Sequence, residues 1–121
     1  MSNLVKLLIV DDEVELLEMY RDFLESEGFE VLTASTGEEA LRIFHQNGDV
    51  KVIISDSHMG QMNGEEFFHA LKKTNQNIPP FLLATGDLNR SEVELKAMGM
   101  TGLVLKPFDL DELVVKIKSC I

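Results

Sequence analysis

The stretch that decides the fold is 51–64, which reads KVIISDSHMGQMNG. After Lys51 it continues with Val52, Ile53 and Ile54, a short unbroken β-branched run of the kind found in strands buried on both faces. Asp56 ends this run. Because burying an unpaired charge is costly, a carboxylate at the tip of an apolar strand needs a reason, either a cap for the following turn or a binding role. The other strand ends of the chain decide between the two.

The length and composition indicate one globular domain over residues 1–121, without an output domain. The net charge of -10 argues against nucleic acid or an anionic membrane as a direct partner, since both are polyanions. Cys120 is the single cysteine, which suits a reducing cytosol. Residues 1–10 lack the charged and apolar regions of a signal peptide, and no apolar run approaches the roughly 20 residues that span a bilayer. We therefore expect a cytoplasmic protein without membrane insertion.

Apolar runs and helical periodicity predict strands that alternate with helices. Strands are expected at 4–10, 29–34, 51–56, 81–85 and 102–105, and helices at 13–27, 37–46, from 64 onward, at 87–98 and from 109 onward. The helix over 87–98 has the weakest apolar stripe. Gly28 is expected to end the first helix in a left-handed conformation. Asp109, with Glu112 three residues later, is expected to cap the last one.

This alternation implies an α/β fold, a parallel sheet with helices on both faces. The short connections favour a doubly wound, flavodoxin-like arrangement of five strands in the order 2-1-3-4-5 with five helices. In that order, ligands bind beyond the carboxyl ends of the first and third strands, where the winding reverses.

Polar residues stand at four of the expected strand ends. Asp11 and Asp12 follow the first strand and Asp56 ends the third, so three carboxylates meet in one crevice. Thr85 and Lys106 lie on its other flank. Two carboxylates about 4 Å apart repel by roughly 4 kcal/mol at an effective dielectric near 20. The group must therefore protonate in part or hold a cation, and an all-oxygen site of this kind suits Mg²⁺ or Mn²⁺.

The same set of groups fits phosphoryl transfer to a carboxylate. Lys106 would neutralise a phosphoryl group, Thr85 would donate a hydrogen bond to it, and one carboxylate would attack. Phosphoryl transfer asks the protein mainly for positioning and charge neutralisation, which these residues supply.

The chain resembles the receiver domain of two-component response regulators across essentially its whole length. The motifs that carry the resemblance are Asp11-Asp12, Asp56 followed by Met59, Met62 and Gly64, then Thr85-Gly86, and finally Lys106-Pro107-Phe108. Each is weak alone, but their order and spacing together are highly specific.

The resemblance implies a role for each of these residues. Asp56 would be the phosphoacceptor, and Asp11, Asp12 and Asp56 would bind Mg²⁺ together with the backbone carbonyl of His58. Thr85 and Lys106 would contact the phosphoryl group, and the Lys106–Pro107 peptide bond would be cis. The phosphodonor would be a histidine kinase or a histidine phosphotransfer protein. The domain would be no enzyme beyond its own phosphorylation and dephosphorylation, and it would switch protein contacts through the surface of its fourth helix, fifth strand and fifth helix.

The sequence departs from the family pattern at two positions. Gly60 stands where the family usually has proline, which predicts a looser loop after Asp56. Leu103 stands where an aromatic residue often changes rotamer on phosphorylation, so Leu103 is expected to modify that readout. His58 and Asp87 occupy variable positions along the route of the hydrolytic water, and we predict that they set the lifetime of the phosphorylated state.

Other functions leave different signatures. A flavin-binding electron carrier with this sheet order needs a loop rich in glycine and hydroxyl groups after the first strand, where this chain has three acids. An aspartyl-phosphate phosphatase uses an acid two residues after its nucleophile, where this chain has His58. Residues 11–13 could also simply favour a helix N-terminus. The alternative that stays open is an interaction module with the same fold that is not phosphorylated.

Overall fold

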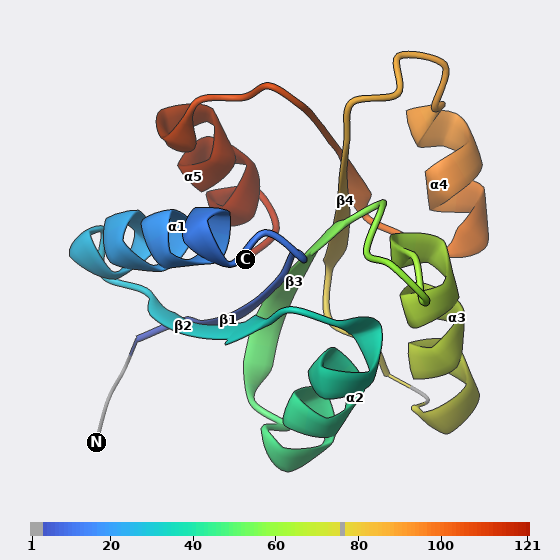
Figure 1. Cartoon of the computed structure of the whole chain (residues 1–121), viewed down its shortest axis with the longest axis horizontal. Helices are drawn as coiled ribbons and strands as arrows, with labels where there is room; N and C mark the ends of the chain where they lie inside the picture. The colour runs from blue at the N-terminus through green and yellow to red at the C-terminus, as the bar shows by residue number, and fades with distance from the viewer. Residues whose placement is uncertain (1–3, 76) are drawn as a thin grey trace.

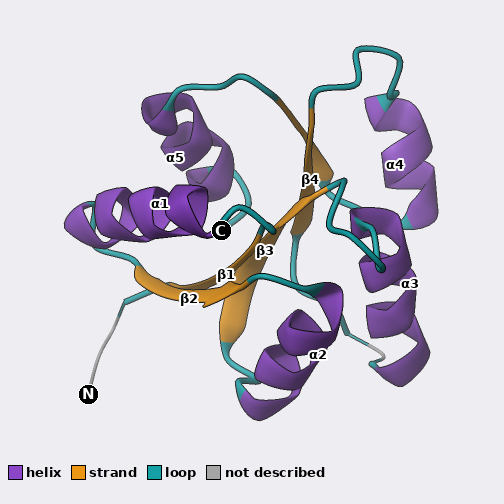
Figure 2. Cartoon of the chain, in the orientation of Figure 1, coloured by secondary structure: helices purple, strands orange, loops and turns teal. Residues whose placement is uncertain are grey.

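In the computed structural model, which describes residues 4–75 and 77–121, strands and helices alternate along the chain as expected (Figures 1 and 2). The stretch 1–10, which lacks the features of a signal peptide, includes residues 1–3, and these lie outside the described part. The strands are β1 (Lys6–Val10), β2 (Glu30–Ala34), β3 (Val50–Asp56), β4 (Phe81–Thr85) and β5 (Gly102–Leu105). The helices are α1 (Val14–Ser26), α2 (Gly37–Gln46), α3 (Gly64–Thr74), α4 (Glu92–Met98) and α5 (Leu110–Lys118).

The strands form one parallel sheet in the order β2-β1-β3-β4-β5, which confirms the predicted flavodoxin-like topology. Side chains alternate across the sheet. Leu7 and Ile9 pack with α1 and α5, whereas Leu8 and Val10 pack with α2, α3 and α4. Figure 1 shows α1 and α5 together on one side of the sheet and α2 and α3 on the other. Because both faces are covered, the strands carry the near-continuous apolar runs from which they were predicted.

Helix α4 is shorter than the sequence predicts, and this corrects the expected helix at 87–98. Residues 87–90 form a turn instead. The Asp87 side chain accepts a hydrogen bond from the Asn89 N–H at 2.9 Å, and the Arg90 N–H donates to the Asp87 carbonyl at 3.2 Å. Such side-chain bonds to nearby backbone compete with helix formation. The helix begins only after Ser91, whose hydroxyl caps it by accepting from the Glu94 N–H.

The predicted helix ends are formed as expected. Gly28, just beyond α1, has a φ of +96°, which is the left-handed conformation. Asp109 accepts a hydrogen bond from the Glu112 N–H at 2.7 Å and caps α5. A full capping box, which the sequence analysis did not single out, joins Asn63 and Glu66 at the start of α3. Within the described ranges, none of the helices is both long and apolar enough to cross a membrane.

Candidate functional site

Three carboxylates meet at the carboxyl edge of the sheet, as the sequence predicts. The register pairs Val10 with Ser55, so the residue after each, Asp11 and Asp56, lie side by side. Carboxylate oxygens of Asp11, Asp12 and Asp56 all lie within 4.8 Å of one another. Asp11 and Asp56 are buried, with 2% and 8% of their surfaces exposed, whereas Asp12 faces solvent. Two of the three carboxylates are therefore shielded from solvent, and the third is accessible to it.

Lys106 reaches this group from the end of β5. Its ammonium lies 2.9 Å from Asp56 Oδ1 and 3.5 Å from Asp11 Oδ2. Its backbone N–H donates to the Thr85 carbonyl at 2.8 Å, which ties the segment after β5 to the end of β4. The Lys106–Pro107 peptide bond is cis, as the resemblance implied.

The pKa shifts reflect crowded negative charge. Burial raises the pKa of Asp11, and the nearby Asp56 charge adds to the effect, against the opposing hydrogen bond from the Glu13 N–H and the charge of Lys106. Burial would lower the pKa of Lys106, but its hydrogen bond to Asp56 and the charges of Asp11 and Asp56 outweigh it and raise that pKa. One ammonium against three carboxylates leaves a net charge of two negatives, which a divalent cation would neutralise. The carboxylate oxygens present therefore fit Mg²⁺ chemically.

The loop from β3 to α3 is closely packed around Asp56. The Ser57 N–H donates to the Ala84 carbonyl at 2.9 Å, and the Gly64 N–H donates to the Ser57 carbonyl at 3.1 Å. A Cβ added to Gly64 would lie 2.5 Å from the Asp56 carbonyl oxygen and 2.6 Å from a methyl carbon of Leu83. Only glycine fits there, which gives the Gly64 motif position a physical reason. Gly60 has a φ of +70°, a backbone conformation that the ring of proline excludes.

Thr85, His58 and Asp87 line one small pocket beside Asp56, of about 220 Å³. Thr85 is buried, and its hydroxyl accepts a hydrogen bond from the Asp87 N–H at 3.1 Å. His58 is exposed, and its Nδ1 lies 2.9 Å from the Ser57 hydroxyl. The two predicted modulators therefore share a cavity with Thr85, although their effect on a lifetime stays a prediction.

Two residues of this pocket were missed by the sequence analysis, namely Arg90 and Glu65. They form an ion pair between the β4–α4 loop and the start of α3. No motif marks either residue; the only signal is an arginine close behind Thr85 in a strongly acidic chain.

Leu103, the third predicted modulator, lies on β5, on the opposite side of β4 from Asp56. It is partly buried and packs against the cluster beneath α2, α3 and α4. The position therefore links the sheet edge to the α4 side of the molecule, while its role as a readout stays a prediction.

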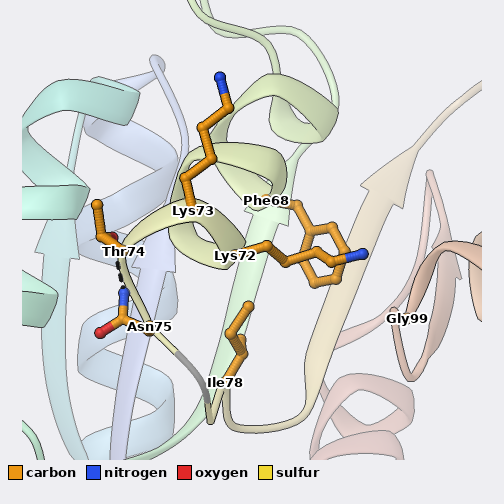
Figure 3. Close-up of a pocket in the computed structure, with 7 residues that line it drawn as sticks. All are labelled: Phe68, Lys72, Lys73, Thr74, Asn75, Ile78 and Gly99. Atoms are coloured by element: carbon orange, nitrogen blue, oxygen red, sulfur yellow. Dashed lines mark hydrogen bonds between the residues drawn. The ribbon is translucent and has the colours of Figure 1, made fainter.

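A separate pocket of about 610 Å³ lies by the C-terminal end of α3 (Figure 3). Figure 3 shows the Lys72 side chain extending across the Phe68 ring, and its ammonium lies 5.6 Å from the ring centre. Lys72 also donates to the Met98 carbonyl at 3.0 Å. The described lining residues of this pocket include no carboxylate, so the acidic edge of the sheet is the better candidate for phosphoryl chemistry.

Residues 7–118 match the family model of the response regulator receiver domain. The chain belongs to the response regulator receiver family. This receiver domain is thereby placed in two-component, phosphorelay signal transduction, and the alternative of an unphosphorylated interaction module is not favoured. The family is not one of typical enzymes; its receiver domains bind Mg²⁺ and interact with histidine kinases or phosphotransfer proteins.

Solved structures of the family superimpose on the receiver domain over nearly its whole length. The chemotaxis response regulator CheY4 of Vibrio cholerae is 35% identical with a TM-score of 0.87, and the match covers 98% of this chain and 100% of that one. The response regulator protein TrrA from Thermotoga maritima, solved in complex with Mg(2+)-BeF, is 30% identical with a TM-score of 0.83 and the same coverage.

A curated relative, the transcriptional regulatory protein CpxR homolog of Haemophilus influenzae, is 35% identical over 114 residues. Those residues are 94% of this chain and 49% of that protein. The receiver domain thus spans about half the length of the curated relatives it matches. The expectation that no output domain accompanies it stays a prediction.

Proposed function

We propose that Asp56 of this receiver domain accepts a phosphoryl group from a phosphohistidine donor. The observation that carries the proposal is the convergence of three carboxylates on one lysine at the carboxyl edge of the sheet. Asp56 is the carboxylate nearest the Lys106 ammonium, at 2.9 Å, so a phosphoryl group placed there would gain the closest cation. Asp11 and Asp12 then remain as ion ligands.

In the proposed reaction, an Asp56 carboxylate oxygen bonds to phosphorus while the bond from phosphorus to the donor histidine nitrogen breaks. The nitrogen leaves with the bonding electron pair, and no oxidant or further reactant is needed. Lys106 would stabilise the charge on the phosphoryl oxygens. The Thr85 hydroxyl, which already accepts from the Asp87 N–H, keeps its own hydrogen free to donate to the same group.

Asp11, Asp12, Asp56 and the backbone carbonyl of His58 would hold Mg²⁺. The ion would supply positive charge against the carboxylates and the incoming phosphoryl oxygens. Without it, the excess negative charge of the site opposes the approach of an anionic donor.

The donor would lie in a groove next to Lys106. A cavity of about 720 Å³ separates α1 from the segment that follows β5, with Lys106 and Glu13 at its wall. Its other side chains are mainly apolar, namely Leu16, Met19, Tyr20, Pro107, Phe108, Asp109 and Leu110. Acidic Glu13 and Asp109 at this groove favour a donor helix with an apolar stripe and basic flanks, carried by a histidine kinase or phosphotransfer protein.

The downstream protein would contact the surface of α4, β5 and α5. Val93 and Val115 there are 77% and 69% exposed. Glu92 pairs with Lys96 and Lys116, so α4 and α5 are joined by charge beside these apolar side chains. The domain would bind this protein in the cytoplasm. Its net charge of -10 disfavours direct binding to nucleic acid, which is a polyanion.

Ion binding and activation can be measured separately by NMR titration. Mg²⁺ should shift the amides around the three carboxylates, and Asp11→Asn should weaken Mg²⁺ binding about tenfold or more, while Asp22→Asn on the exposed face of α1 should not. Beryllofluoride with Mg²⁺ should then shift residues of the β4–α4 loop, and Lys106→Met should slow phosphorylation by acetyl phosphate about 100-fold. Wild-type rates in Lys106→Met would remove the proposed role of that lysine.

A further inference from the structure

Arg90 spans the pocket beside Asp56. It stands at the end of the turn 87–90 that precedes α4, and its guanidinium pairs with Glu65 in the first turn of α3. Both residues line the same cavity as Thr85 and His58. The cavity opens directly beyond Asp56, because Ser57 follows Asp56 and Thr85 follows Ala84, its partner in the sheet.

The Arg90 guanidinium is drawn inward rather than extended into solvent. Its side chain is 26% exposed, and that of Glu65 is 33% exposed. Both Nε and Nη2 are buried; Nη2 contacts the Glu65 carboxylate, whereas Nε has no hydrogen-bond partner among the described residues. A guanidinium gives up such hydrogen bonds to water only where a charge holds it in place, and the carboxylate of Glu65 is that charge.

Within the described part of the chain, the other polar contacts of the turn 87–90 are local. The Asp87 N–H donates to the Thr85 hydroxyl, and the Asn89 and Arg90 N–H groups both donate to Asp87. Leu88, at the tip of the turn, is 82% exposed and adds no buried apolar contact. The pair between Arg90 and Glu65 is thus the polar link from this turn to α3.

We propose that the Arg90–Glu65 pair is a closure over this pocket and limits the access of water to phosphorylated Asp56. This inference rests on the proposed phosphoacceptor role of Asp56. In the loss of phosphate, a water oxygen bonds to phosphorus, the bond from phosphorus to the Asp56 oxygen breaks, and inorganic phosphate leaves with the water's protons shared between it and solvent. Arg90 and Glu65 are positioning residues in this scheme, since neither touches the reacting atoms.

The strength of the pair sets the size of the effect. Partly exposed ion pairs are worth up to about 1 kcal/mol, which is about fivefold in an opening equilibrium. If water enters through the open form, removing either partner should speed dephosphorylation about two- to fivefold. Removing both should have no larger effect, because the second substitution has no pair left to break.

The test uses Arg90→Met, Glu65→Gln, the double variant, and the exchange Glu65→Arg with Arg90→Glu. Each protein is loaded with acetyl phosphate and Mg²⁺, freed of donor, and followed by intact mass for loss of the phosphoryl group. Arg42→Met is the matched control, since it breaks an exposed Arg42–Glu39 pair on α2 that lies outside this pocket. Thermal unfolding of every variant confirms that it is folded.

Equal acceleration in both single variants, none beyond it in the double variant, and a return toward the wild-type rate in the exchange would support the closure. Wild-type rates in both single variants would overturn it. So would acceleration in Arg90→Met with slowing in Glu65→Gln, because that pattern marks Arg90 as a direct phosphoryl ligand. A wild-type domain that takes no label at Asp56 would overturn the proposed function, and the closure with it.

Discussion

The β3–α3 and β4–α4 loops flank the same site but are held in different ways. The first is bonded to the neighbouring strand through Ser57, and Gly64, where the loop joins α3, leaves no room for a single added carbon. The second has open space around Gly86 and is held mainly by local bonds and by the Arg90–Glu65 pair. The β3–α3 loop, which would help to bind the ion, is thus preformed, whereas the β4–α4 loop, which would respond to phosphate, is held by few contacts. Such a division suits a switch, because the responding segment needs a second arrangement of similar free energy.

The helices that follow the two loops give the largest expected contrast. Helix α3 buries Phe67, Phe68 and Leu71, whereas α4 buries only Leu95. Leu71→Ala and Leu95→Ala should each lower the free energy of unfolding by about 2–5 kcal/mol, because each leaves a cavity in the core. Hydrogen exchange should show α4 losing its protection alone in Leu95→Ala, while α3 stays protected in Leu71→Ala. Uniform loss of protection in both variants would show that the two helices are held equally.

The two glycines test the loops themselves. Gly64→Ala should destabilise the fold by about 1–3 kcal/mol, because the new methyl group meets the Asp56 carbonyl and Leu83. Gly86→Ala should change stability by no more than about 0.5 kcal/mol, since nothing lies within 4 Å of the added carbon. Urea unfolding of both variants measures the difference, and equal losses would contradict the distinction between a packed and an open loop.

Removing the N-terminal cap of α3 should destabilise the fold more than removing that of α4, and the difference should be smaller than that between the two glycines. Asn63 takes part in a reciprocal capping box with Glu66, whereas Ser91 caps α4 through one bond of 3.3 Å. Asn63→Ala should cost about 1–2 kcal/mol and Ser91→Ala about 0.5–1 kcal/mol. A larger loss from Ser91→Ala, read by chemical denaturation, would mean that α4 depends on its cap more than its geometry indicates.

The smallest effect concerns pH and the link between α4 and α5. Burial would raise the pKa of Glu92, but its hydrogen bond to Lys96 and the charges of Lys116 and Lys96 outweigh it, and the pKa lies below its ordinary 4.5. A lowered pKa stabilises the folded state above pH 4.5, and this stabilisation is lost as pH falls through the lowered value. Glu92→Gln should therefore cost about 0.5 kcal/mol near neutral pH and progressively less below pH 4.5. Glu94→Gln, on the exposed surface of α4, is the control; a loss that does not change with pH would argue against the ion pairs.

Most of the fold could be predicted from the sequence because the strands are buried on both faces. Their unbroken apolar runs place β4 and β5 at the predicted residues, and α2 likewise begins at Gly37 and ends at Gln46. The α4 region could not be predicted as well. Its apolar residues Leu88 and Val93 are exposed, so they carry no information about burial, and the Asp87 turn replaces the first part of the expected helix.

The functional site, too, could be predicted from the sequence only in part. Asp11, Asp56 and Lys106 could be predicted to converge, because parallel strands bring their carboxyl ends to one edge of the sheet. The Arg90–Glu65 pair could not, since it joins a side chain of the β4–α4 loop to one in the first turn of α3, and the path of that loop depends on tertiary packing. The sequence predicts that the Thr85 hydroxyl faces a phosphoryl group. Its hydrogen bond from the Asp87 N–H could not be predicted, because any residue at position 87 other than proline has that backbone donor.

The most direct test of the central claim is to find where a phosphoryl group becomes attached. The domain is incubated with acetyl phosphate, with and without Mg²⁺, and the modified residue is located by peptide mass spectrometry after trapping the acyl phosphate with borohydride. We expect one label at Asp56 that depends on Mg²⁺ and disappears in Asp56→Asn. A label on Asp11, Asp12 or any residue outside the site, or none on a folded protein, would contradict the account.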